Sequence, residues 1–65
     1  MKDNADIEIS THTAFYIFEP LTEKGSKWLV ENVFGAEYGK SVVVKLENVV
    51  NLCQAAHEDG IRLKY

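Results

Sequence analysis

An alternating run between Ile7 and Phe18 constrains the fold of this chain more than any other feature of its sequence. Every second residue from Ile7 to Ile17 is β-branched or aromatic, and this two-residue period is typical of a β-strand with two different faces. The run ends at Glu19 and Pro20, because proline has no N–H for a ladder hydrogen bond. The pattern predicts one strand from Ile7 to about Phe18, strongest from Thr13 onward.

A helix is predicted directly after Pro20. Thr22 is a good N-cap, because its hydroxyl can accept a hydrogen bond from the first turn. Trp28, Leu29 and Val33 then follow helical spacing on one face. Gly25 falls on the same face, where it costs roughly 1 kcal/mol of helix propensity relative to alanine. We therefore expect a close approach of this helix to a neighbouring element at Gly25.

The rest of the chain predicts a strand, a second helix and a last strand. Residues 34–39 contain two glycines and form a turn, and residues 41–45 form a short apolar strand. The second helix has an apolar stripe formed by Val49, Val50, Cys53 and Ala56. Gly60 ends this helix, and residues 61–65 alternate between apolar and basic side chains.

These elements predict a β-α-β-α-β order in one small two-layer domain of residues 7–65, preceded by a mobile acidic tail at residues 1–6. The class is α/β or α+β, with a three-stranded sheet that is at least partly parallel and two helices on one face. The strands at 41–45 and 61–65 are predicted to be parallel neighbours through a right-handed crossover. The direction of the first strand and the strand order stay open.

Composition excludes several classes of protein. The chain has 65 residues, with 10 acidic and 7 basic side chains and a net charge of −3. No apolar run approaches the roughly 20 residues that cross a bilayer, and residues 1–6 lack the apolar segment of a signal peptide. Cys53 is the single cysteine, so an internal disulfide is impossible. We expect a cytoplasmic protein without a membrane, cofactor or metal partner.

Three features resemble catalytic motifs, and each is better explained by structure. Cys53 and His57 are four residues apart on a helix, but Cys53 lies on the stripe that should face the core. His12 has hydroxyl neighbours without a defined acid or oxyanion donor. The segment 39–41 reads Gly-Lys-Ser but leads into a strand, whereas a phosphate-binding loop opens a helix. The sequence predicts no enzyme.

With only two helices, one face of the predicted sheet lacks a cover. Parallel sheets are buried on both sides, so either the first strand is antiparallel or the bare face meets another molecule. The candidate partner-binding residues on this face are Tyr16, Lys45, Arg62 and Lys64. Aromatic and basic residues on an exposed sheet also form platforms for single-stranded nucleic acid. The acidic balance of the chain argues against that alternative.

The order of motifs resembles a group of short, uncharacterised bacterial and prophage-encoded proteins. The shared pattern consists of an aromatic strand, Pro20-Leu21-Thr22, Trp28-Leu29 in the helix, Val42-Val43-Val44 after Gly39, and Asp59-Gly60-Ile61. Members of the group often have proline after the apolar strand, where this chain has Leu46 and Glu47. The resemblance covers about residues 13–64 and implies the same order of elements, with no activity, cofactor or site attached.

The function predicted from the sequence is protein–protein interaction without catalysis. The prediction rests on the bare sheet face and on at least one free strand edge. The partner is another protein or a second copy of the chain in a homodimer, and the prophage resemblance suggests a small regulator or inhibitor. A nucleic-acid-associated factor is the alternative.

Overall fold

In the computed structural model, which describes residues 4–65, the alternating run folds back on itself. Strands β1 (Ile7–His12) and β2 (Phe15–Pro20) form an antiparallel hairpin, with Thr13 and Ala14 as its two-residue loop. Thr13 has φ of +53°, and hairpin loops of this length need a positive φ at a central residue. The prediction of one continuous strand was wrong, because this turn uses threonine and alanine instead of glycine or asparagine.

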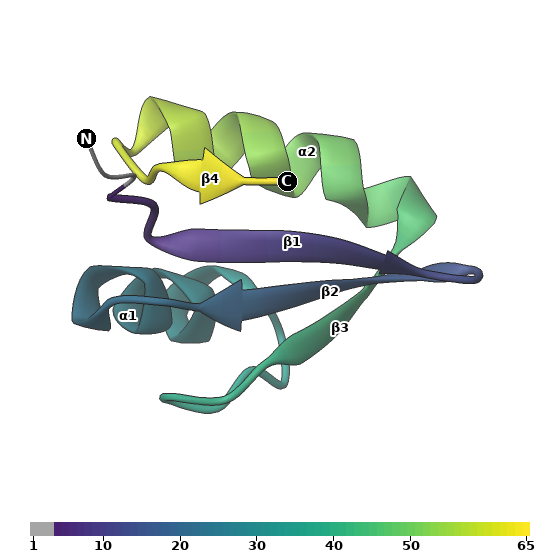
Figure 1. The fold of residues 1–65 in the computed structure, drawn as a ribbon, viewed down its shortest axis with the longest axis horizontal. Coiled ribbons are helices and arrows are strands. Elements are labelled where there is room, and N and C mark those ends of the chain that lie inside the picture. Colours follow the sequence, from purple (N-terminus) through teal and green to yellow (C-terminus); the bar gives the residue numbers. More distant parts are fainter. Residues whose placement is uncertain (1–3) are drawn as a thin grey trace.

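The chain continues as α1 (Glu23–Asn32), β3 (Val42–Lys45), α2 (Leu46–Glu58) and β4 (Leu63–Lys64). The sheet has four strands in the order β3-β2-β1-β4 (Figure 1). β1 pairs antiparallel with β2, and β2 pairs antiparallel with β3, whereas β4 runs parallel to β1. The result is a small α+β domain with a mixed sheet.

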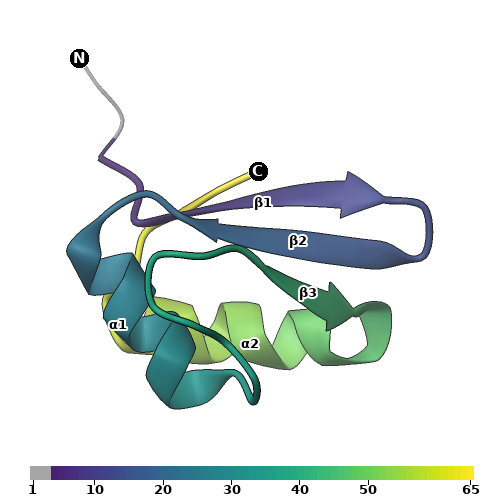
Figure 2. The same cartoon turned by 90° about the horizontal axis from the view of Figure 1, so that it is seen from below.

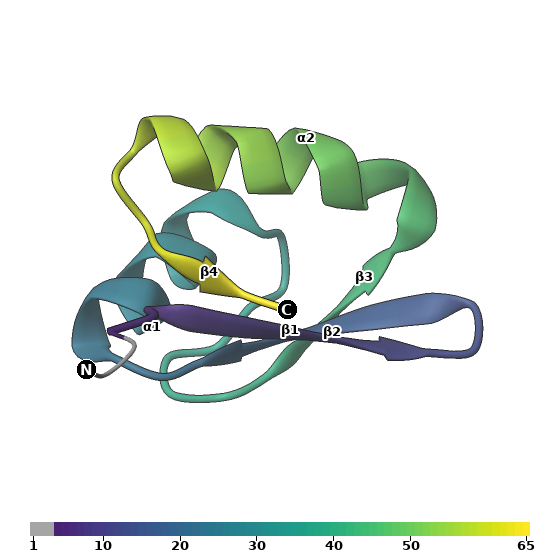
Figure 3. The same cartoon turned by 45° about the horizontal axis from the view of Figure 1, so that its top comes forward.

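Both helices lie on the same face of the sheet, so the domain has two layers (Figures 2 and 3). This arrangement and the partly parallel sheet confirm the coarse prediction. The predicted order with three strands was wrong in detail, because the hairpin supplies two central strands where one was expected. As a result β3 and β4 lie at opposite edges of the sheet and are not neighbours.

The first helix begins as its sequence predicts. The Thr22 hydroxyl accepts a hydrogen bond from the Gly25 N–H at 3.1 Å, which satisfies one free donor of the first turn. Gly25 is buried, and a β-carbon at this position would collide with the carbonyl oxygen of Asp6. The expected close approach at Gly25 is therefore confirmed, and its neighbour is the backbone that leads into β1.

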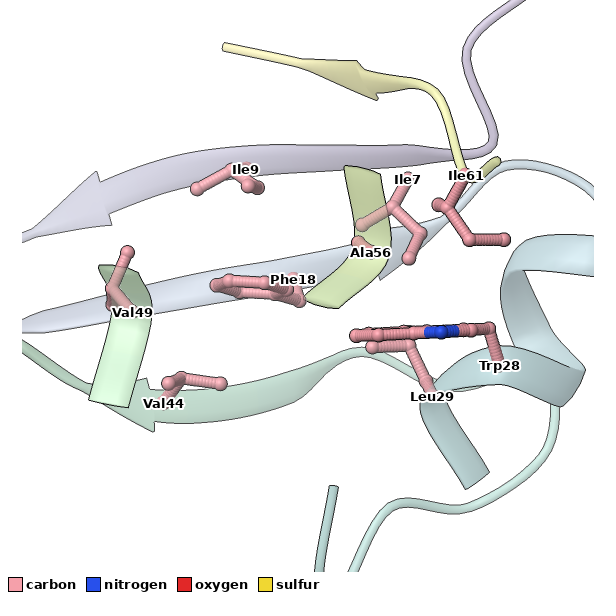
Figure 4. Packing of buried hydrophobic residues seen from close by; sticks show 9 residues of the cluster. All are labelled: Ile7, Ile9, Phe18, Trp28, Leu29, Val44, Val49, Ala56 and Ile61. Atoms are coloured by element: carbon pink, nitrogen blue, oxygen red, sulfur yellow. The ribbon is translucent and has the colours of Figure 1, made fainter. Parts of the chain in front are cut away.

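One hydrophobic core lies between the two layers. It consists of Ile7, Ile9, Phe18, Trp28, Leu29, Val44, Val49, Ala56 and Ile61 (Figure 4). Trp28 is 6% exposed and Phe18 is fully buried, so two large aromatic side chains fill the centre. The predicted core position of Trp28 is confirmed, whereas Val50, expected on the buried stripe of α2, is 71% exposed.

Asp6 corrects the predicted boundary of the acidic tail. Residues 1–3 lie outside the described residues, but Asp6 is only 7% exposed. Its Oδ1 accepts a hydrogen bond of 2.7 Å from the Thr22 hydroxyl, and its Oδ2 accepts one of 3.0 Å from the Arg62 N–H. The ordered domain therefore includes Asp6, which links the starts of β1 and α1 to the segment before β4.

Candidate interaction surface

The face of the sheet opposite the helices forms one broad surface. No described element between residues 4 and 65 covers it (Figure 2). Because strand partners point to the same side, the registers define this surface, here called the open face. Its members in the paired strands are Glu8, Ser10, His12, Phe15, Ile17, Glu19, Val43, Lys45 and Lys64. Arg62, just before β4, is added because Ile61 and Leu63 on either side of it pack on the core side.

An apolar patch occupies one part of the open face. Ile17 is directly opposite Val43 in the β2–β3 ladder, and Phe15 lies two residues from Ile17 on the same side of β2. Phe15 is 47% exposed and Val43 is 59% exposed, although both lie within a regular sheet. Adjacent exposed apolar residues on a sheet are typical of a contact surface for another molecule.

The charged residues of the open face gather mainly at its other part. Glu8 is opposite Glu19 in the hairpin and opposite Lys64 in the ladder with β4. Arg62 comes just before β4, and it is assigned to the same side as Lys64 because its neighbours Ile61 and Leu63 both pack on the core side. Lys45 stands apart from this group, because it lies on the edge strand β3, opposite Phe15 of β2.

Three of the four predicted binding residues share the open face, and Tyr16 does not. Tyr16 is opposite Val44 in the β2–β3 ladder, and it packs against the core on the helix side. The placement of Tyr16 on the open face was therefore wrong. The two-residue loop pairs odd-numbered residues of β1 with even-numbered residues of β2, so Phe18 and Tyr16 join Ile7 and Ile9 on the buried side.

Phe15 and Ile17 were not predicted as surface residues, for the same reason. A single strand would have put them on the face of Ile7 and Ile9. The signal that could have revealed them is the five-residue apolar run 14–18, which lacks the polar alternation of residues 7–12.

A groove separates α2 from the end of the chain. It has a volume of about 750 Å³, and its lining includes Cys53 and His57 on α2 and Leu63 and Tyr65 opposite them. Desolvation raises the pKa of the Tyr65 hydroxyl, and the negative charge of a Cys53 thiolate and a hydrogen bond with Cys53 raise this pKa further. Tyr65 is therefore a neutral hydrogen-bonding group near physiological pH.

Cys53 was predicted to face the core and not to form a catalytic pair with His57. Cys53 is half-buried and packs against the core, while His57 is exposed at the groove. Among residues 4–65, no three histidine, cysteine, aspartate or glutamate side chains come close enough to hold a metal ion. His12 lies on the open face near the hairpin loop, directly opposite Phe15.

Among residues 4–65, Asp6 is the one charged residue that is buried. Burial alone would raise the pKa of its carboxyl group. The hydrogen bonds from the Arg62 N–H and the Thr22 hydroxyl, with the positive charges of Lys24 and Arg62, outweigh that effect and lower the pKa. Asp6 is therefore ionised at neutral pH, and its position in the network gives it a structural role.

Comparisons with protein-family models, with curated proteins and with solved structures gave no match for this chain. In the part of the chain that the structure describes, neither helix has the length and apolar content to cross a membrane.

Proposed function

We propose that this protein is a small interaction module without catalytic activity, and that its open face is the contact surface for another protein molecule. The apolar patch of Phe15, Ile17 and Val43 carries the proposal. Burying one such side chain fully contributes about 1.5–3 kcal/mol, so three adjacent residues can anchor a contact. The polar residues around the patch would form the rim of the interface.

The distribution of positive charge supports a protein partner over nucleic acid. Lys45 and Lys64 lie on the two edge strands, which are three strand spacings or about 14 Å apart. The β1 residues in line with them, His12 and Glu8, are four positions apart along the strand, so the two lysines are farther apart than the strands. Two carboxylates, Glu8 and Glu19, lie on the two strands between those edges. A nucleic-acid backbone binds best to a continuous basic surface, which this face lacks among the described residues.

The test compares one variant on the patch with a matched variant elsewhere. Phe15→Glu places a charge on the patch, and Val30→Glu places the same charge at an exposed position of α1, away from the patch. The solution mass is measured by light scattering over a concentration series, and partners are captured with the wild type and with both variants. We expect a homodimer or a stoichiometric protein partner that Phe15→Glu loses and Val30→Glu keeps.

Two results would contradict the proposal. One is a wild-type protein that stays monomeric and captures no stoichiometric partner. The other is equal behaviour of Phe15→Glu and Val30→Glu. Salt-sensitive binding of single-stranded oligonucleotides by the wild type would favour the nucleic-acid alternative instead.

A further inference from the structure

The outer edge of β4 presents unpaired backbone groups. The register pairs Ile7 with Leu63, and the Ile7 N–H donates to the Arg62 carbonyl at 3.2 Å. In a parallel ladder, alternate residues direct both backbone groups toward the same neighbour. Arg62 and Lys64 therefore bond toward β1, and Leu63 directs its N–H and carbonyl to the outside. Within residues 4–65 no strand lies beyond this edge.

Helix α2 presents a stripe of two apolar residues and one histidine, Val50, Cys53 and His57, beside that edge. The helix lies in the layer behind the sheet, next to β4 (Figures 1 and 3). Val50 precedes Cys53 by three residues and His57 by seven, so the three share one side of the helix. Cys53 and His57 line the groove, and Val50 is exposed. A fifth strand beside β4 would cover this stripe with every second side chain.

The charges on β4 argue against a second copy of β4 as that strand. An antiparallel pair of β4 strands centred on Leu63 would place Arg62 of each copy opposite Lys64 of the other. These four positive charges would lie on one face, and like charges directly opposite each other destabilise a pair of strands. Acidic residues at the same positions would instead form favourable cross-strand pairs with Arg62 and Lys64.

We infer that the edge of β4 binds an extended peptide of another protein as a fifth strand, in which acidic and apolar residues alternate. The acidic side chains lie on the open face beside Arg62 and Lys64. The apolar side chains enter the groove against Cys53 and Val50. Backbone hydrogen bonds to Leu63 give part of the affinity, and the alternation gives the specificity. This inference rests on the proposed function and names one class of partner.

The test uses three labelled eight-residue peptides and the full chain. In the first, valine and glutamate alternate. The second replaces each glutamate with lysine, and the third keeps the first composition but groups four valines before four glutamates. Binding is measured by fluorescence anisotropy, and the Leu63 amide is followed by NMR hydrogen exchange. We expect the first peptide to bind about tenfold more tightly than either control and to slow exchange at Leu63.

Reversing the charges provides the specific control. In Arg62→Glu/Lys64→Glu, both substituted side chains are exposed, and the preference should switch to the valine–lysine peptide. Circular dichroism checks that this variant is folded. If it is not, the single variant Lys64→Glu replaces it, with a smaller shift of peptide preference in the same direction. Val50→Glu should weaken binding of the first peptide. Equal binding of the alternating and grouped peptides, or unchanged exchange at Leu63, would overturn the inference.

Phe15→Glu separates this inference from the proposed function. Phe15 lies on the apolar patch, and two strands separate β2 from the outer edge of the sheet beside β4. The variant should therefore bind the alternating peptide as the wild type does. If Phe15→Glu loses the protein partner but still binds the peptide, both proposals stand. If the wild type captures a partner but does not bind the alternating peptide, only the fifth-strand inference is overturned.

Discussion

The indole N–H of Trp28 donates a hydrogen bond of 2.8 Å to Oδ2 of Asp59, which joins α1 to the residue that caps the end of α2. Each helix packs on the sheet separately, and this bond is a polar link between them. Trp28 therefore has two structural roles, because it fills the core and fixes the position of the α2 terminus.

Removing this hydrogen bond should cost less than removing the indole ring. Asp59→Ala should lower the free energy of unfolding by about 1 kcal/mol, the usual contribution of one hydrogen bond. Trp28→Ala should cost about 3–5 kcal/mol, enough to unfold a domain of this size. Urea unfolding followed by circular dichroism measures both. A double-mutant cycle of Trp28→Phe and Asp59→Ala should give a coupling energy close to the loss of stability in Asp59→Ala alone. A coupling energy near zero would contradict a stabilising hydrogen bond between the two residues.

The buried carboxylate of Asp6 should make the domain sensitive to acid. The pKa of Asp6 is lower in the folded state than the value of about 3.9 for an unfolded chain. Its stabilising contribution is therefore complete above the unfolded pKa and is lost as the pH falls through the folded pKa. Asp6→Asn should be less stable than the wild type at pH 7, and the difference should shrink as the solution becomes more acidic.

Unfolding of both proteins in urea between pH 7 and pH 2 measures this effect. Glu31→Gln is a suitable control, because Glu31 is exposed on α1. A stability difference between Asp6→Asn and the wild type that is the same at every pH would contradict the role of the charge.

Gly25→Ala should destabilise the protein although alanine is the better helix former. The gain in helix propensity is about 1 kcal/mol. The added β-carbon would meet the carbonyl oxygen of Asp6, and backbone shifts of this kind cost about 1–3 kcal/mol. We expect a lower thermal midpoint in Gly25→Ala and little change in Lys27→Ala, which alters an exposed position of the same helix. A higher midpoint in Gly25→Ala would show that α1 has room to move away from β1.

The hairpin loop should accept a stabilising substitution. A left-handed conformation costs a residue with a side chain about 1–3 kcal/mol, and glycine adopts it freely. Thr13→Gly should therefore stabilise the domain by about 0.5–1 kcal/mol after the entropy cost of glycine. Ala14→Gly should lower stability, because the positive φ belongs to Thr13 alone in this loop. Thermal unfolding of the two variants distinguishes these outcomes.

Elements with local signals were predictable from the sequence. Thr22 marks the start of α1, and the spacing of Trp28 and Leu29 identifies its buried side. The apolar strand before α2 also follows from a local pattern. The hairpin was missed because Thr13 and Ala14 have no turn preference that distinguishes them from strand residues. That single omission changed the face of every residue in β2, and with it the composition of the candidate surface.

Features that depend on distant residues were not predictable. Asp6 resembles the other acidic residues near the start of the chain, and its hydrogen-bond partners Thr22 and Arg62 lie 16 and 56 positions away. Similarly, the alternation of residues 61–65 predicts a strand but does not identify β1 as its partner. Pairing between distant segments is determined by how the whole sheet closes, which a local pattern does not encode.

The parallel pairing of β4 with β1 has a consequence for the time course of synthesis. The first three strands can assemble as an antiparallel sheet while the chain is still growing, but the fourth position stays vacant until residues 61–64 leave the ribosome. Until then the carboxylate of Asp6 lacks the Arg62 amide, and the edge of β1 is open to other strands. A chain that has been made only as far as α2 therefore presents the edge of its central strand β1 to other molecules, and pairing with β4 removes that edge.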